Sequence, residues 1–126
     1  MSKLDNITNK TNSYNLAREA KLAQNTWERM RGLLGRPPLQ PGQALLLERC
    51  NSVHTFGMTY PIDVIFVDHN MMILHQIHAM NPCRISRLVW RSHLAIELPA
   101  GVLVQSRTYP AHQLVLQPIP EGCSVS

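Results

Sequence analysis

Short apolar runs separated by turn residues follow one another through residues 44–119 of the chain. Four of them read ALLLERC, DVIFVD, HLAIEL and HQLVLQPI, and each is bounded by polar, glycine or proline residues. Runs of this length, rich in aliphatic residues, predict β-strands rather than helices. The turn residues Asp68, His69 and Asn70 separate DVIFVD from the run MMILHQIHAM, so these two runs are predicted to form a hairpin.

The segment before residue 35 has two interpretations. Apolar residues recur at helical spacing and would make one long amphipathic helix of Leu16, Ala20, Ala23, Trp27, Met30 and Leu34. However, Asn25 followed by Glu28 is a capping pattern that belongs at a helix start. We therefore predict an extended segment over residues 14–23 and a short helix over residues 26–34, ended by Gly35 and the following prolines.

The number of strands decides the fold class. We expect five to seven strands with one or two short helices, and GVLVQSRTY at 101–109 fits a short helix or a strand. A small domain must protect its sheet edges, and partial closure does so. The prediction is an α+β protein with a strongly curved or barrel-like, mostly antiparallel sheet. One domain is expected over residues 14–118, between flexible tails at 1–13 and 119–126.

The composition of the chain indicates the cellular compartment expected for the protein. The chain has no run of about 18 apolar residues that could span a membrane, and its first residues lack the features of a secretory signal. The odd number of cysteines, Cys50, Cys83 and Cys123, fits a reducing compartment, so a cytoplasmic protein is expected.

The net charge of +4 raises nucleic acid as a partner. Aromatic residues, which stack on single strands, make up only 6% of the chain, so nucleic acid is not expected. Two groups of arginines lie close together in the chain, and these are Arg29, Arg31 and Arg36, and Arg84, Arg87 and Arg91.

The nonapeptide CNSVHTFGM at 50–58 concentrates chemically active residues. If it is extended, its alternate positions share one face, and these are Cys50, Ser52, His54, Phe56 and Met58. Cys50 and His54 are then weak candidates for two ligands of a zinc ion, but no second close pair completes the site, and no metal or cofactor is predicted. Cys50 activated by His54 would be a nucleophile, but no activating turn is evident, and packing is the favoured role for this thiol.

Two carboxylates fall inside predicted strands. Asp63 enters the DVIFVD strand, and Glu97 lies within AIELPAG, so each needs a partner if it is buried. The arginines near Arg36 are the predicted partners. His54 has the alternative role of an interior histidine that donates to a carbonyl and accepts from Thr55 or Asp63.

Three motifs occur in order: WERMRGLLGR, CNSVHTFGMTYPIDVIFVD and AIELPAG. Together they resemble the family known as domain of unknown function 192, from about residue 22 to residue 116. The motif positions carried over are Arg29, Gly32, Leu33, Arg36, His54, Thr55, Met58, Ile62, Asp63 and residues 96–101. The resemblance implies a compact domain with a curved sheet, and it implies no established activity.

The chain departs from that family in two respects. Many relatives carry Gly-Asp before the last strand, where this chain has Ala111 and His112. Many relatives also carry a signal peptide and resemble envelope proteins. This chain shows no signal peptide, so an exported role is not expected.

Two functions are compatible with these residues. The first is a non-catalytic binding or accessory domain, whose polar pocket around His54, Asp63 and Glu97 holds a small polar or anionic ligand or a partner's peptide segment. The second is an enzyme of unknown reaction, with His54 as general acid or base and Asp63 or Glu97 as its orienting group. The candidate cluster comprises Arg36, Cys50, His54, Thr55, Met58, Asp63 and Glu97.

Overall fold

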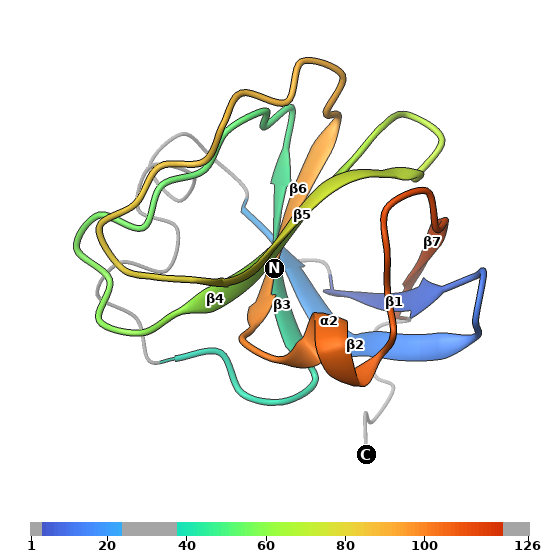
Figure 1. The fold of residues 1–126 in the computed structure, drawn as a ribbon. Helices are drawn as coiled ribbons and strands as arrows, with labels where there is room; N and C mark the ends of the chain where they lie inside the picture. The colour runs from blue at the N-terminus through green and yellow to red at the C-terminus, as the bar shows by residue number, and fades with distance from the viewer. Residues whose placement is uncertain (1–3, 24–37, 120–126) are drawn as a thin grey trace.

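The computed structural model describes residues 4–23 and 38–119 of the chain, and Figure 1 shows their arrangement. The elements are β1 (Leu4–Asn9), β2 (Tyr14–Leu22), β3 (Gln43–Glu48), β4 (Ile62–Val67), β5 (Ile73–Met80), β6 (Leu94–Pro99), α2 (Val102–Gln105) and β7 (Leu114–Pro118). The strands predicted from the apolar runs and from residues 14–23 are confirmed. The segment left open at 101–109 contains the short helix α2. The helix predicted over 26–34 lies outside the described residues.

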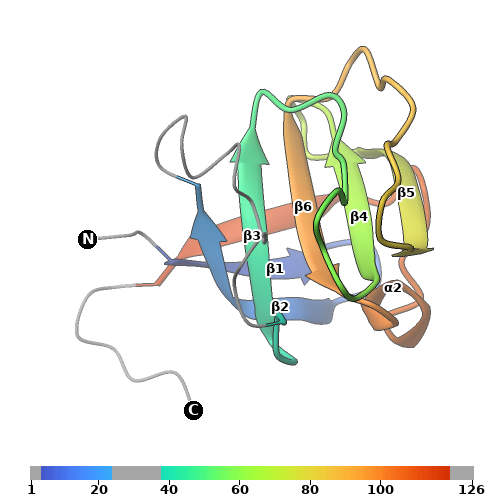
Figure 2. The same cartoon turned by 90° about the vertical axis from the view of Figure 1, so that its left-hand side faces the viewer.

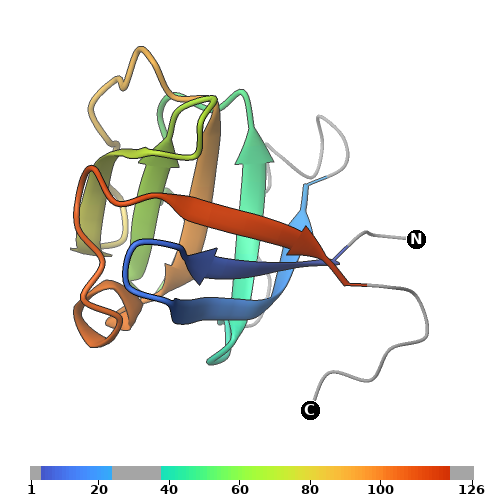
Figure 3. The ribbon, with the colours of Figure 1, turned by 90° about the vertical axis from the view of Figure 1, so that its right-hand side faces the viewer.

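All seven described strands belong to one curled sheet, in the order β5-β4-β6-β3-β2-β1-β7. β2 and β3 are parallel, and the other neighbouring pairs are antiparallel. Figures 2 and 3 show how the sheet curls until its two edge strands approach each other. There an isolated bridge joins Met72, next to β5, to Gln113, next to β7. The sheet is a half-barrel, and the predicted barrel-like, mostly antiparallel fold is confirmed.

The sheet buries side chains on both faces where β3, β4 and β6 lie together. In β6, Leu94, Ile96 and Leu98 enter a first cluster with Ile7 and Leu103, while Ala95 enters a second cluster on the opposite face. Strands buried on both faces appear as continuous apolar runs, as ALLLERC and DVIFVD do. The second cluster is covered from outside by loop residues Val53, Met58 and Val89.

The prediction of a flexible tail over residues 1–13 is wrong for residues 4–13. β1 pairs with both β2 and β7, and Ile7 and Asn9 are fully buried. The sequence did not predict this strand because LDNITN is mostly polar. The Asn9 amide can be buried because it has hydrogen-bond partners. Its Nδ2 donates to Thr108 Oγ1 at 3.1 Å and lies 3.0 Å from His112 Nδ1. Residues 120–126 of the predicted C-terminal tail lie outside the described residues.

The turn before β7 holds a strained residue. Ala111 has a φ of 72°, in the left-handed region where a side chain costs about 1 kcal/mol, and its N–H donates to the Ile73 carbonyl at 2.9 Å. His112 contributes ring Nδ1 to the contact with the Asn9 amide.

Ala111→Gly is therefore expected to stabilise the protein by about 0.5 kcal/mol, the relief of strain less the added entropy of the unfolded chain. Urea denaturation at equilibrium would measure the change. Ala100→Gly is the matched control, because Ala100 is exposed and has no positive φ. That control is expected to lose stability, and a loss of stability in both variants would contradict the strain.

Candidate functional site

The nonapeptide 50–58 does not present its alternate residues on one face. Val53, Thr55 and Met58 are buried, whereas His54 and Phe56 are exposed. The expectation of a single face that includes His54 and Met58 is therefore wrong. The extended segment ends in a turn at Phe56, and Gly57 follows with a φ of 80°, which breaks the two-residue period.

Thr55 is the main connection between two long loops. Its N–H donates to the Arg84 carbonyl at 2.8 Å, and its carbonyl accepts from the Cys83 N–H at 3.0 Å. Its hydroxyl donates to the Asn81 carbonyl at 2.6 Å and accepts from the Arg84 N–H at 2.9 Å. Both the backbone and the side chain of Thr55 are thus engaged, which assigns this motif residue a structural role.

We call the segments 49–61 and 81–93 the loop pair. Figures 1 and 2 both show the two segments side by side over one face of the sheet. Beyond Thr55, they are joined by Ser86 N–H to the Val53 carbonyl at 2.8 Å and by Val89 N–H to the Asn51 carbonyl at 2.8 Å. An isolated antiparallel bridge between His54 and Ile85 lies among these bonds. The loop pair is therefore held as a short two-stranded ribbon.

The exposed side chains of the loop pair are mainly apolar and basic. The His54 ring stacks on Phe56 with centroids 5.1 Å apart. Of the seven exposed large hydrophobic residues in the described part of the chain, four lie here: Phe56 (51% exposed), Ile85 (67%), Leu88 (44%) and Trp90 (80%). The loop pair also carries exposed arginines and has no acidic residue; the arginines are Arg49, Arg84, Arg87 and Arg91. We call this the loop-pair surface.

Asp63 is buried, as its place in a strand predicted, but backbone amides are its partners. Its Oδ1 accepts from Ala79 N–H at 2.8 Å, and its Oδ2 accepts from Gly101 N–H at 3.1 Å and from Leu103 N–H at 2.9 Å. The arginines expected as its partners, Arg29, Arg31 and Arg36, lie outside the described residues. Because both carboxylate oxygens are used, Asp63 fixes the turn between β6 and α2. The described contacts do not join it to His54.

Glu97 is the most unusual group in the described structure. It lies on β6 opposite Leu45 and Val64, both members of the second cluster, and is only 4% exposed. Its Oε2 has no hydrogen-bond partner in the described part of the chain, and neither has the buried hydroxyl of Tyr60. Burial raises the pKa of Glu97 to about 7. The pKa of Tyr60 is also raised, first by burial and second by the nearby charge of Glu97.

Of the remaining candidates, Cys50 packs at the edge of the second cluster, and its thiol donates to the Ser52 carbonyl at 3.1 Å. Within residues 4–23 and 38–119, no three His, Cys, Asp or Glu side chains are grouped as metal ligands. Arg36 lies outside the described residues.

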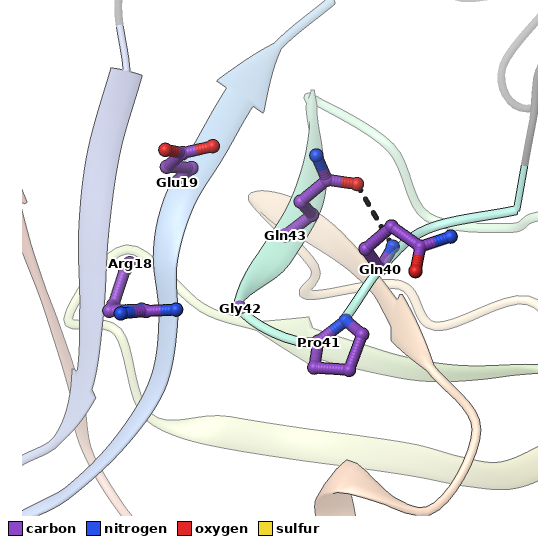
Figure 4. A pocket seen from close by; sticks show the side chains of 6 residues that line it. All are labelled: Arg18, Glu19, Gln40, Pro41, Gly42 and Gln43. Atoms are coloured by element: carbon purple, nitrogen blue, oxygen red, sulfur yellow. Dashed lines mark hydrogen bonds between the residues drawn. The ribbon is translucent and has the colours of Figure 1, made fainter. Parts of the chain in front are cut away.

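A small polar pocket that the sequence did not indicate lies between β2 and the turn before β3 (Figure 4). It has a volume of about 100 Å³ and is lined by Arg18, Glu19, Gln40, Pro41, Gly42 and Gln43. The Gly42 carbonyl accepts from the N–H groups of Arg18 and Glu19, both at 2.9 Å, and Gln43 Oε1 accepts from Gln40 N–H at 2.9 Å. This pocket contains none of the predicted site residues, and we assign it no ligand.

The fold and the site define a class of protein. It is a curled half-barrel whose second cluster is covered by a hydrogen-bonded loop pair with exposed apolar and basic side chains. The chain belongs to the DUF192 family of uncharacterized ACR proteins, whose profile matches residues 7–115. The resemblance stated from the three sequence motifs is therefore confirmed.

Two solved structures share the fold. A protein of unknown function from Novosphingobium aromaticivorans DSM 12444 is 15% identical with a TM-score of 0.76, over 89% of this chain and 83% of that one. A putative transcription regulator from Sinorhizobium meliloti 1021 is 18% identical with a TM-score of 0.76, over 92% of this chain and 94% of that one. No curated protein matches the chain. The described residues contain no helix long and apolar enough to cross a membrane.

Proposed function

We propose that the protein is a non-catalytic binding module that holds its partner on the loop-pair surface. The observation that carries this proposal is the concentration of large exposed hydrophobic side chains there, with Trp90 80% exposed. Scattered single hydrophobic residues are normal on a protein surface, whereas a gathered group marks an interaction site. His54, the central residue of the family motif, belongs to this surface through its stacking on Phe56.

The contacts of the two carboxylates also favour binding over catalysis. The catalytic alternative pairs His54 with Asp63 or Glu97 as the group that orients its ring. Asp63 gives both oxygens to backbone amides. Glu97 pairs with Leu45 and Val64 of the second cluster, and its Oε2 has no hydrogen-bond partner among the described residues. The polar site around His54 is therefore proposed as part of the binding surface.

Site-specific photo-crosslinking in living cells tests the proposal without requiring the partner to be known. A photoreactive phenylalanine analogue is placed at Trp90 and, in the matched control, at Val104, which is 69% exposed on α2. We expect a discrete adduct from position 90 and none from position 104. Equal yields at both positions, or none at either, would contradict a partner on the loop-pair surface.

A further inference from the structure

We propose that the partner is the surface of a lipid bilayer that contains anionic lipids, a step that rests on the binding function proposed above. The loop-pair surface places apolar side chains and guanidinium groups in direct succession: Arg84 with Ile85, Arg87 with Leu88, and Trp90 with Arg91. All six of these side chains are exposed. A bilayer interface accepts both kinds of group at one site, because apolar side chains enter the acyl boundary while arginines contact the phosphates above it.

The mixture of residues distinguishes a bilayer from other partners. Of the four large exposed hydrophobic side chains, Ile85 and Leu88 have no ring that could stack on a nucleic-acid base, so single-strand binding would leave both unused. The centre of a protein–protein interface is depleted of charged residues, whereas here an arginine adjoins each of three exposed apolar residues. Tryptophan is enriched where a protein meets the headgroup region, and Trp90 is the most exposed of the large hydrophobic residues described.

Charge complementarity specifies anionic lipids. The loop pair contains four arginines and no aspartate or glutamate, so no acidic side chain within it neutralises the guanidinium groups. The ribbon-like hydrogen bonds between the loops fix the backbone that carries these side chains before binding, which reduces the ordering that binding requires. Arg87 also lies near His75 on β5. The pKa of His75 is lowered first by burial and second by the positive charge of Arg87.

Vesicle flotation tests the proposal, with vesicles of phosphatidylcholine alone and of phosphatidylcholine mixed with phosphatidylglycerol. We expect binding to the mixed vesicles only, and weaker binding as salt is raised. Trp90→Ser is expected to lower the partition coefficient about ten-fold, and Arg87→Gln about five-fold. The matched controls Val104→Ser and Arg107→Gln, exposed elsewhere, are expected to bind like the wild type.

A spectroscopic reading accompanies flotation. The chain has two tryptophans, so Trp27→Phe leaves Trp90 as the sole indole. Once this variant is shown to melt like the wild type, mixed vesicles are expected to shift its emission to shorter wavelength.

The outcomes separate this inference from the proposed function. A protein adduct at position 90 without vesicle binding would overturn the lipid inference and keep the binding module. Preference for a single-stranded oligonucleotide over mixed vesicles would do the same. Vesicle binding that Val104→Ser reduces as much as Trp90→Ser would overturn the lipid inference at this surface, and the absence of any adduct at position 90 would remove the binding function itself.

Discussion

Replacing Asp63 by alanine is expected to destabilise the protein by about 4 kcal/mol, a large part of the roughly 5–15 kcal/mol that holds a typical domain folded. The carboxylate is 1% exposed and accepts hydrogen bonds from the N–H groups of Ala79, Gly101 and Leu103. Its removal leaves these donors without an acceptor at the junction of β4, β5 and the turn to α2. Buried donors that lose their acceptor carry the full cost of desolvation.

Asp63→Asn provides a second measurement if the alanine variant does not fold. One amide oxygen can still accept from Gly101 and Leu103, but the amide nitrogen then faces the Ala79 N–H, donor against donor. We expect a loss of about 2 kcal/mol in urea denaturation.

The matched control is Asp68→Asn. Asp68 also accepts from two backbone amides, those of Asn70 and Met72 at 2.8 and 3.0 Å, but in the more accessible β4–β5 turn. Water can replace part of those bonds, and a loss below about 1 kcal/mol is expected. Equal losses at Asp63 and Asp68 would contradict the role of burial at Asp63.

The apolar strands could be predicted from the sequence because burial on both faces leaves an uninterrupted aliphatic run, as in DVIFVD. β1 could not be predicted in this way. The buried residue Asn9 of β1 is polar. Its amide can be buried because Thr108 and His112, about a hundred residues later in the chain, supply hydrogen-bond partners. Hydrophobic periodicity indicates burial only where the buried residues are apolar. It therefore does not predict a strand whose buried position is polar and is held by long-range hydrogen bonds.

The candidate site was predictable only in part, for related reasons. The burial of Asp63 follows from its place in a strand, but the sequence cannot show that the backbone amides of Ala79, Gly101 and Leu103 donate to it. The exposure of His54 depends on the turn at Gly57 and on pairing with Ile85, both set by the tertiary fold. The loop-pair surface was missed because its residues come from two segments that only folding brings together.

Glu97→Gln is expected to stabilise the protein at alkaline pH by about 3 kcal/mol. Burial raises the pKa of Glu97 from 4.5 to about 7 in the folded protein, because its charged form loses hydration beside Leu45 and Val64, and Oε2 has no hydrogen-bond partner among the described residues. A shift of that size corresponds to about 3 kcal/mol between the protonated and charged forms. Above pH 7 the wild type must hold a charge that the glutamine variant does not carry.

The direction of the pH dependence follows from proton binding. Between pH 4.5 and 7 the folded wild type keeps a proton on Glu97 that the unfolded chain has released, so its stability falls as pH rises through this window. Below pH 4.5 the side chain is protonated in both states, and the two proteins should differ little. The measurement is the free energy of unfolding of each protein, by urea denaturation at several pH values from 4 to 9.

The difference between the two curves isolates Glu97 from the other titratable groups of the protein. Glu48→Gln is the matched control, since Glu48 lies on β3, in the same β3–β6 ladder as Glu97, but is exposed. Its replacement is expected to change stability by less than about 0.5 kcal/mol at every pH. If the wild-type and Glu97→Gln curves run parallel, the charged carboxylate is solvated or partnered in the folded protein. A gap that widens between pH 4.5 and 7 instead locates an unpartnered charge beneath the loop pair, where only the fold of the second cluster keeps it from water.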